Sequence, residues 1–187
     1  MFTFRTLALA TLATVSLVSA AGQANAQASL TAEPVTLTVA NSFSLAQTTP
    51  MNFGSFIVLA DTVGVKTATL MMNPGTGAIT PTNDAPAQFV QVNIAAASRG
   101  VYAISGAAPN TTLSVSTASL TDLHCGACAG APPDVTLTSV TADDSTPTTD
   151  GSGGATVNFG AVLTTVAGGN QYVSGTYAGS FDISVTY

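Results

Sequence analysis

The clearest pattern in the sequence is the stretch Tyr177-Ala178-Gly179-Ser180-Phe181-Asp182-Ile183-Ser184-Val185-Thr186-Tyr187. Its odd-numbered positions are aromatic, aliphatic or glycine, and the even-numbered positions from Asp182 to Thr186 are polar. Successive side chains of a β-strand point to opposite faces, so this period of two predicts a strand with one buried face and one solvated face. Such half-buried strands are typical of antiparallel sheets.

Weaker versions of the same alternation occur earlier in the chain. They lie at 35–39, 90–94, 113–116, 135–138 and 157–163. Turn-forming clusters of Gly, Pro and Asn separate them, among them 73–77, 83–86 and 168–170. No segment repeats convincingly at the 3.6-residue period of a helix. The pattern predicts one antiparallel β-sandwich of seven or eight strands over residues 35–187.

The first 26 residues have the composition of an export signal. Arg5 supplies a positive charge, 7–20 is apolar and uncharged, and Ala24-Asn25-Ala26 offers small residues for cleavage before Gln27. A retained membrane anchor is the alternative, but the apolar run is shorter than the roughly 20 residues that span a bilayer. We therefore expect a protein exported to the periplasm, the cell surface or the medium.

Charge is scarce, at 6% of the 187 residues, and the net charge is -6. Loss of Arg5 with the signal leaves only Lys66 and Arg99 as strongly basic residues. That balance argues against a nucleic-acid partner. No later stretch is long enough to span a membrane, so we expect no membrane span in the mature chain.

Residues 143–154 form an acidic segment rich in Gly, Ser and Thr, with aspartates at Asp143, Asp144 and Asp150. The spacing does not match the regular calcium loop of alternating oxygen ligands that closes with a distal Glu. We expect an exposed, mobile hairpin loop, with calcium binding as the alternative.

Cys125 and Cys128 are the two cysteines, and His124, the single histidine, precedes them. A Cys-x-x-Cys pair can form a redox site, half of a metal site or a structural disulfide. Redox chemistry needs a helix that lowers a thiol pKa, and the following Ala129-Gly130-Ala131-Pro132-Pro133 does not favour one. Zinc would need four ligands. Export favours the disulfide.

Little in the sequence points to catalysis. There is no Gly-x-Ser-x-Gly elbow, His124 is the only histidine, and the mature chain has one glutamate, Glu33, and no Trp. Two aspartates could still converge as in a glycosidase, which spacing alone does not decide. We expect a protein that is not an enzyme, with no catalytic residues, metal or cofactor.

Two motifs resemble those of a known family. Residues 51–54 read Met51-Asn52-Phe53-Gly54 and residues 71–77 end in Asn73-Pro74-Gly75-Thr76-Gly77, similar to the opening pattern of the bacterial family called domain of unknown function 4402. Residues 155–163, Asn170-Gln171 and 175–187 are similar to its closing pattern, G-T-Y-x-G-x-F-x-V-x-V-x-Y. The positions that carry the resemblance are Asn52, Phe53, Gly54, Pro74, Gly77, Gly175, Tyr177, Gly179, Phe181 and Tyr187.

A fainter resemblance is to chaperone-usher pilin subunits and spore-coat-U-type proteins, which also end in an alternating strand with a final Tyr. It implies an immunoglobulin-like sandwich that lacks one strand, the gap being filled by an N-terminal extension of the next subunit. The candidate extension is 27–34, with Leu30 and Ala32 as the inserted side chains and Pro34 as its boundary. A frayed terminus before an ordinary edge strand is the alternative, since such donors usually have four or five apolar positions.

These features predict a secreted structural protein of the bacterial surface, such as a pilus-like or coat subunit that assembles by strand addition. Its partners would be copies of itself or other surface subunits, with a periplasmic chaperone and an outer-membrane usher if it is pilus-like. The alternative is a monomeric adhesion module that binds a surface or carbohydrate. Exposed aromatic residues usually mark such modules, whereas most aromatics here fall in alternating strand positions and are expected in the core.

Overall fold

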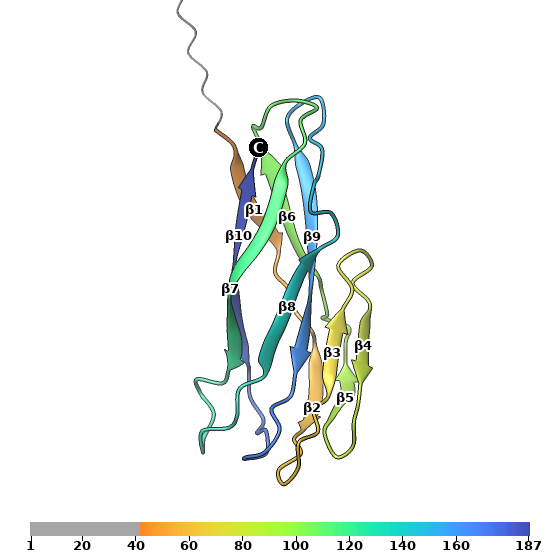
Figure 1. Cartoon of the computed structure of the whole chain (residues 1–187), viewed down its shortest axis with the longest axis vertical. Helices are drawn as coiled ribbons and strands as arrows, with labels where there is room; N and C mark the ends of the chain where they lie inside the picture. The colour runs from red at the N-terminus through yellow and green to blue at the C-terminus, as the bar shows by residue number, and fades with distance from the viewer. Residues whose placement is uncertain (1–41) are drawn as a thin grey trace, which may run out of the picture. The chain divides into compact units, whose positions relative to one another are not determined.

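The computed structural model describes residues 42–187, which fold into antiparallel β-strands without a helix (Figure 1). The all-β prediction is confirmed. The strands are β1 (Ser44–Thr49), β2 (Ser55–Leu59), β3 (Thr69–Met72), β4 (Ile79–Thr82), β5 (Gln88–Asn93), β6 (Gly100–Ser105), β7 (Ser114–His124), β8 (Thr136–Ala142), β9 (Ala155–Thr164) and β10 (Ala178–Thr186). The expected strand at 35–39 lies outside the described residues.

One large sheet and two strand pairs make up the fold. The large sheet has the order β1-β6-β9-β3-β4, with β8 also paired to β9, while β10 pairs with β7 and β2 pairs with β5. Several strands were not predicted because their sequences lack a regular alternation of polar and apolar residues. β1 is almost wholly exposed, and β2 carries apolar side chains on both faces. Within residues 42–187, no helix has the length and apolar character to cross a membrane.

Strand β9 lies at the centre of the core. It pairs with β6 and β3 along one edge and with β8 along the other, and one of its faces is buried through Val157, Phe159, Ala161 and Leu163. Gly160 interrupts its alternation for a steric reason: a Cβ there would lie 2.7 Å from the backbone nitrogen of Pro74. The glycine therefore allows β9 to pass close to the turn that follows β3.

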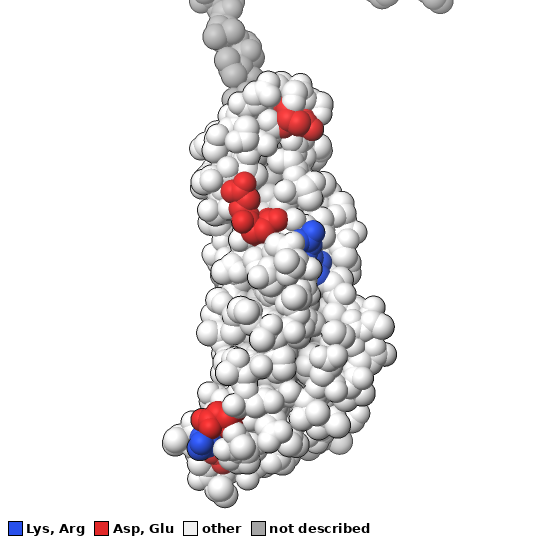
Figure 2. Space-filling view, turned by 90° about the vertical axis from the view of Figure 1, so that its right-hand side faces the viewer, with Lys and Arg blue, Asp and Glu red and all other residues white. Residues whose placement is uncertain are grey.

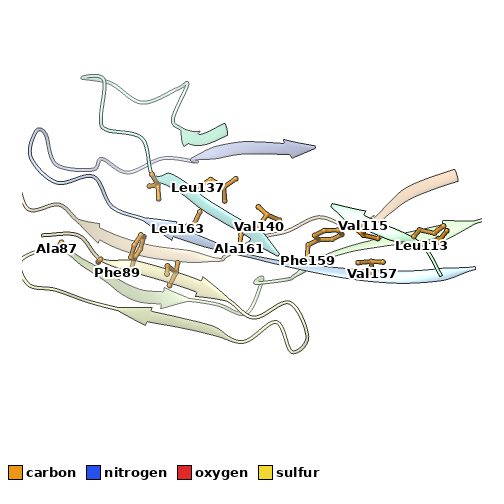
Figure 3. Packing of buried hydrophobic residues seen from close by; sticks show 14 of the residues in the cluster. Ala87, Phe89, Leu113, Val115, Leu137, Val140, Val157, Phe159, Ala161 and Leu163 are labelled. Carbon is orange, nitrogen blue, oxygen red and sulfur yellow. The ribbon is translucent and has the colours of Figure 1, made fainter. Parts of the chain in front are cut away.

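The core runs along the length of the domain. Figure 3 shows Leu113, Val157 and Phe159 toward one end and Phe89 and Ala87 toward the other. The Phe159 ring of β9 lies 6.0 Å from the Phe181 ring of β10. The large sheet and the β7–β10 pair thus pack face to face in a sandwich-like arrangement.

The chain changes sheet between β1 and β2. Asn52 exchanges two backbone hydrogen bonds with Ser98, each 2.8 Å, and its side-chain oxygen accepts the N–H of Gly54. Gly54 has a φ of +84°, and a Cβ there would lie 2.6 Å from the carbonyl oxygen of Asn93. The Asn-Phe-Gly motif is therefore the crossover that sends β1 to β6 and β2 to β5.

The acidic loop at 143–154 connects β8 and β9 as a hairpin loop, and most of its residues are exposed, as expected. Its backbone pairs with the start of β7 and the residue before it: Leu113 N–H donates to Pro147 and Val115 N–H donates to Ser145, at 2.9 and 2.8 Å. The buried Thr149 hydroxyl also bonds to the segment before β7, at the carbonyl oxygens of Ala108 and Thr111. These contacts hold the loop against the domain because they satisfy its backbone groups within the fold.

Candidate functional site

A groove of about 900 Å³ opens between β2 and β10, and we call it the β2–β10 groove. One wall is the crossover and β2, and the other is the segment 173–181, which leads into β10. Its floor comes from buried side chains of the core, among them Phe89, Leu137, Val140 and Leu163. None of the residues that line it is charged. The groove is therefore suited to an uncharged, partly apolar occupant.

The groove-side edge of β2 is unpaired. Phe89 donates its N–H to the side-chain oxygen of Asn83 at 2.8 Å, so its backbone groups face away from β2. Val58 lies opposite Phe89. Opposed residues in an antiparallel ladder either exchange both bonds or neither, so the N–H and C=O of Val58 point away from β5. By the same alternation, the N–H and C=O of Phe56 also point away from β5. No strand of residues 42–187 pairs with this edge of β2.

Gln171 closes one end of this edge. Its side-chain amide donates to the carbonyl oxygen of Ala60 and accepts the Ala60 N–H, both at 3.1 Å. Ala60 lies two residues after Val58, so its N–H and C=O point to the same edge of β2 as those of Val58. The carboxamide therefore occupies the position that a neighbouring strand would take. The sequence placed Gln171 in the closing motif but did not predict this role.

The facing edge of β10 is also open. Leu123 of β7 exchanges backbone bonds with Val135, at 2.8 and 3.0 Å, so the next residue, His124, faces Ala178 of β10. The β7–β10 register shifts on either side of Ser180, and among residues 42–187 no other strand pairs with β10. Two unpaired edges thus border one groove, which is the arrangement left when a sheet lacks a strand.

The two family motifs meet at this groove although they are far apart in the chain. Its lining includes Asn52, Phe53 and Gly54 on one side and Gly175, Tyr177, Gly179 and Phe181 on the other. The remaining three lie elsewhere. Pro74 and Gly77 belong to the β3–β4 turn, and the half-exposed Tyr187 packs on Phe43, with ring centroids 5.5 Å apart, and accepts the N–H of Ala108.

The predicted disulfide between Cys125 and Cys128 is present. It packs against Gly175 at the rim of the groove: a Cβ at Gly175 would lie 2.6 Å from the Cys125 sulfur. His124 is exposed, and its Nδ1 lies 2.7 Å from a carboxylate oxygen of Asp134. The disulfide therefore supports the segment that leads into β10 by packing against Gly175. The spacing of the two cysteines in the sequence does not indicate this role.

Two tyrosines lie at the end of the groove nearest Gln171. The Tyr172 hydroxyl accepts the N–H of Val166 and donates to the carbonyl of Asp134, and burial raises the pKa of Tyr172. The Tyr177 ring lies 6.0 Å from the Tyr172 ring. Most described aromatics pack in or against the core as predicted, so these two rings line the groove as fixed walls.

The acidic loop uses its carboxylates to hold its own turns. Asp150 accepts the N–H of Gly154 and the hydroxyl and N–H of Ser152, and these bonds lower the pKa of Asp150. Asp143 accepts the backbone N–H and the side-chain amide of Asn158. Among residues 42–187, no three His, Cys, Asp or Glu side chains gather as metal ligands would. The donor candidates Leu30 and Ala32 lie outside the described residues.

The domain is thus an all-β, sandwich-like module with a groove between two open strand edges. Residues 43–187 match the family described as "Domain of unknown function (DUF4402)", and the chain belongs to that family. No curated protein and no solved structure matches the chain.

Proposed function

We propose that this chain is a secreted, non-enzymatic structural protein of the bacterial surface, whose β2–β10 groove accepts an extended segment of another polypeptide. The observation that carries the proposal is the pair of unpaired edges on either side of an apolar floor. A strand laid between them would form main-chain hydrogen bonds with Phe56 and Val58 and place alternate side chains on the floor. Assembly would follow from repetition of this contact, as in a pilus-like or coat structure.

Charge and chemistry favour this function. Natural sheet proteins commonly protect exposed edges with Lys, Pro or bulges. Neither β2 nor β10 contains Lys or Pro, although the ladder of each has a register shift. The groove lining is uncharged, so insertion of an apolar strand leaves no charge unpaired. The disulfide and the signal-like residues 1–26 fit export to an oxidising compartment.

The test is a proline at the open edge. Val58→Pro removes an N–H that faces the groove, whereas the β2–β5 ladder uses the groups of Ile57 and Leu59. Val58→Ala is the matched control, since it keeps the N–H and loses side-chain volume. Light scattering on the mature chain should show oligomers for the wild type and Val58→Ala, and a monomer for Val58→Pro. Oligomers of Val58→Pro equal to those of the wild type would overturn the proposal.

A second variant covers the case in which Val58→Pro does not fold. Val173 is 40% exposed at the rim and belongs to neither ladder. Val173→Asp places a charge where an inserted strand would exclude water, so it should also abolish assembly without unfolding the domain. A wild type that stays monomeric at high concentration and is retained on a glycan array would instead indicate the adhesion module.

A further inference from the structure

We propose that the solvent-facing side of the β2–β5 pair is a lateral contact surface, which binds the same surface of a second copy of this chain. We call the side chains of Ile57, Leu59, Val90 and Val92 the β2–β5 outer face. The inference goes beyond the proposed function, because it concerns a face of the sheet and not the open edge at the β2–β10 groove.

The register of the ladder places these side chains on the outside of the domain. Phe89 is buried, so the next residue, Val90, points outward, and Ile57 lies directly opposite Val90. Leu59 and Val92 follow two residues further along their own strands. The exposed fractions of the four side chains lie between 38% and 61%. Four branched aliphatic side chains therefore face solvent on one strand pair.

Such a face is unusual for a solvated sheet. Antiparallel strands with one side in water normally place polar residues there, whereas strands that are apolar on both sides are typical of sheets covered on both faces. Of the thirteen large hydrophobic residues that are exposed within 42–187, seven lie at 57–65 and 90–94. The exposed apolar surface is thus concentrated around this pair, and a concentration of this kind marks an interaction surface.

The chemistry of the outer face favours a protein partner. A glycan would need hydrogen-bonding groups or an aromatic platform, and the four aliphatic side chains provide neither. An anionic lipid surface would repel a chain with a net charge of -6. Lys66, in the loop after β2, lies 2.6 Å from a carboxylate oxygen of Asp84, so its charge is already compensated.

A second copy meets the requirements of this face. In a two-fold contact the same patch covers itself, so one contact shields both outer faces from water. Two sheet faces that carry aliphatic side chains can pack flat against each other as in a sandwich. Figure 2 shows one side of the domain with its charged side chains in small separate groups on an otherwise uncharged surface, so two acidic copies can approach without a continuous belt of carboxylates between them.

The size of the outer face determines how strongly it binds. Four half-exposed aliphatic side chains bury on the order of 200 Å² per copy, whereas a stable interface buries about 800 Å² per partner. Two free chains therefore remain apart. The contact becomes effective where many copies are held side by side, because several weak contacts between the same two arrays act together.

Microspheres coated densely with the mature chain test the inference. A C-terminal biotin is a suitable attachment, because Figure 1 shows the C-terminus at one end of the domain and β2 toward the other. The parent chain carries Val173→Asp, which keeps insertion into the groove out of the measurement. Parent beads should cluster, and clustering should be lost when Ile57→Thr and Val90→Thr are added. Threonine keeps a β-branched residue in the ladder, and circular dichroism confirms the fold.

Opposite charges provide a gain of clustering that a folding defect cannot imitate. Beads with Ile57→Lys and beads with Ile57→Asp should each stay dispersed, because like charges then meet within one small patch. A mixture of the two should cluster at low salt. Salt at about 1 M should disperse the mixture but not the parent beads, since it screens the ion pairs and not the aliphatic contact.

The matched control is Leu120→Thr. Leu120 lies on β7 and is 40% exposed, so its beads should cluster like the parent. Parent beads that stay dispersed, or clustering that survives Ile57→Thr with Val90→Thr, would overturn the inference. Binding of the parent chain to phosphatidylcholine vesicles without bead clustering would assign the outer face to a lipid and overturn it too. The proposed function is tested separately, by the light scattering of Val58→Pro.

Discussion

The side-chain amide of Gln171 forms two hydrogen bonds of 3.1 Å with the backbone of Ala60, donating to its carbonyl oxygen and accepting its N–H. A glutamine 111 residues away in sequence thus takes the place of one peptide group of a neighbouring strand. Ala60 is 3% exposed, so its backbone groups have little access to water. The contact marks where the paired edge of β2 ends and the open edge begins.

Substitution of Gln171 should destabilise the domain. Gln171→Leu keeps most of the side-chain volume but removes both partners of Ala60, which leaves a shielded N–H and C=O unsatisfied. We expect a loss of about 2 kcal/mol in the free energy of unfolding, measured with urea. Gln171→Glu is the informative companion, because it keeps the acceptor and places a carboxylate against the Ala60 carbonyl. The carbonyl raises the pKa of this carboxyl in the folded state, so the defect should shrink as the pH falls toward the unfolded value of about 4.3 and the protonated acid donates; a defect independent of pH would contradict the two-bond geometry.

Gly175 and Gly126 form a matched pair for the contact with the disulfide. A Cβ at Gly175 would lie 2.6 Å from the Cys125 sulfur, whereas one at Gly126 would meet nothing within 4 Å. Gly175→Ala should cost about 1–3 kcal/mol of unfolding free energy, because the disulfide or the strand must shift. Gly126→Ala should be close to neutral. Equal effects of the two substitutions, in thermal or urea unfolding, would show that Gly175 is not held against the disulfide.

The same contact predicts non-additivity. Replacing Cys125 and Cys128 by Ala should cost about 2 kcal/mol, since the ring that the disulfide closes is short. In that background Gly175→Ala should be tolerated better than in the wild type, because the two sulfur atoms are gone. A double-mutant cycle measures the difference as a coupling energy. A coupling near zero would place the cost of Gly175→Ala elsewhere, such as in the backbone at the start of β10.

Sequence periodicity predicted the fold class and the long strands because these bury one face. β10 reads as an alternating pattern and pairs with β7 along its length, and the segments in β5, β7, β8 and β9 were also found. β2 was missed since Ile57 and Leu59 on its outer face are apolar and 54% and 38% exposed. Because these outward-facing residues are apolar, β2 lacks the alternation of polar and apolar residues on which strand prediction depends.

The groove was harder to predict than the fold. The motif residues could be named from the sequence, but nothing local indicates that Phe53 and Phe181 line the same cavity. Their proximity depends on the sheet change at Gly54 and on the pairing of β10 with β7, which are long-range properties. The contact of Gln171 with Ala60 could not be predicted either, because a single side chain that takes the place of a strand produces no periodic pattern in the sequence.

The loop after β2 should be sensitive to acid. The carboxylate of Asp61 accepts the N–H groups of Lys66 at 3.1 Å, Gly64 at 2.9 Å and Val63 at 3.4 Å. The Lys66 N–H is the largest influence and lowers the pKa of Asp61; burial partly opposes it, and the other two N–H groups and the Lys66 charge add to the lowering. The folded state therefore prefers the ionised carboxylate more strongly than the unfolded chain does.

A depressed pKa fixes the direction of the pH dependence. The stabilisation by Asp61 is fully present above its unfolded pKa of about 3.9 and is lost as the pH falls through the lower pKa of the folded state. Asp61→Asn lacks this titration, so the difference in unfolding free energy between wild type and variant should be constant from pH 7 to 5 and shrink below pH 4. Other carboxylates, such as Asp150, titrate in both proteins and cancel in the difference.

Hydrogen exchange locates the effect in the loop. At neutral pH the amides of Gly64 and Lys66 should exchange faster in Asp61→Asn than in the wild type, after correction for intrinsic rates, because an amide oxygen is a weaker acceptor than a carboxylate. The amide of Ile57, which belongs to the β2–β5 ladder and is not bonded to Asp61, is the internal reference. Faster exchange at Ile57 to the same extent would mean that the whole β2–β5 pair opens, and that Asp61 holds more of the domain than its own turn.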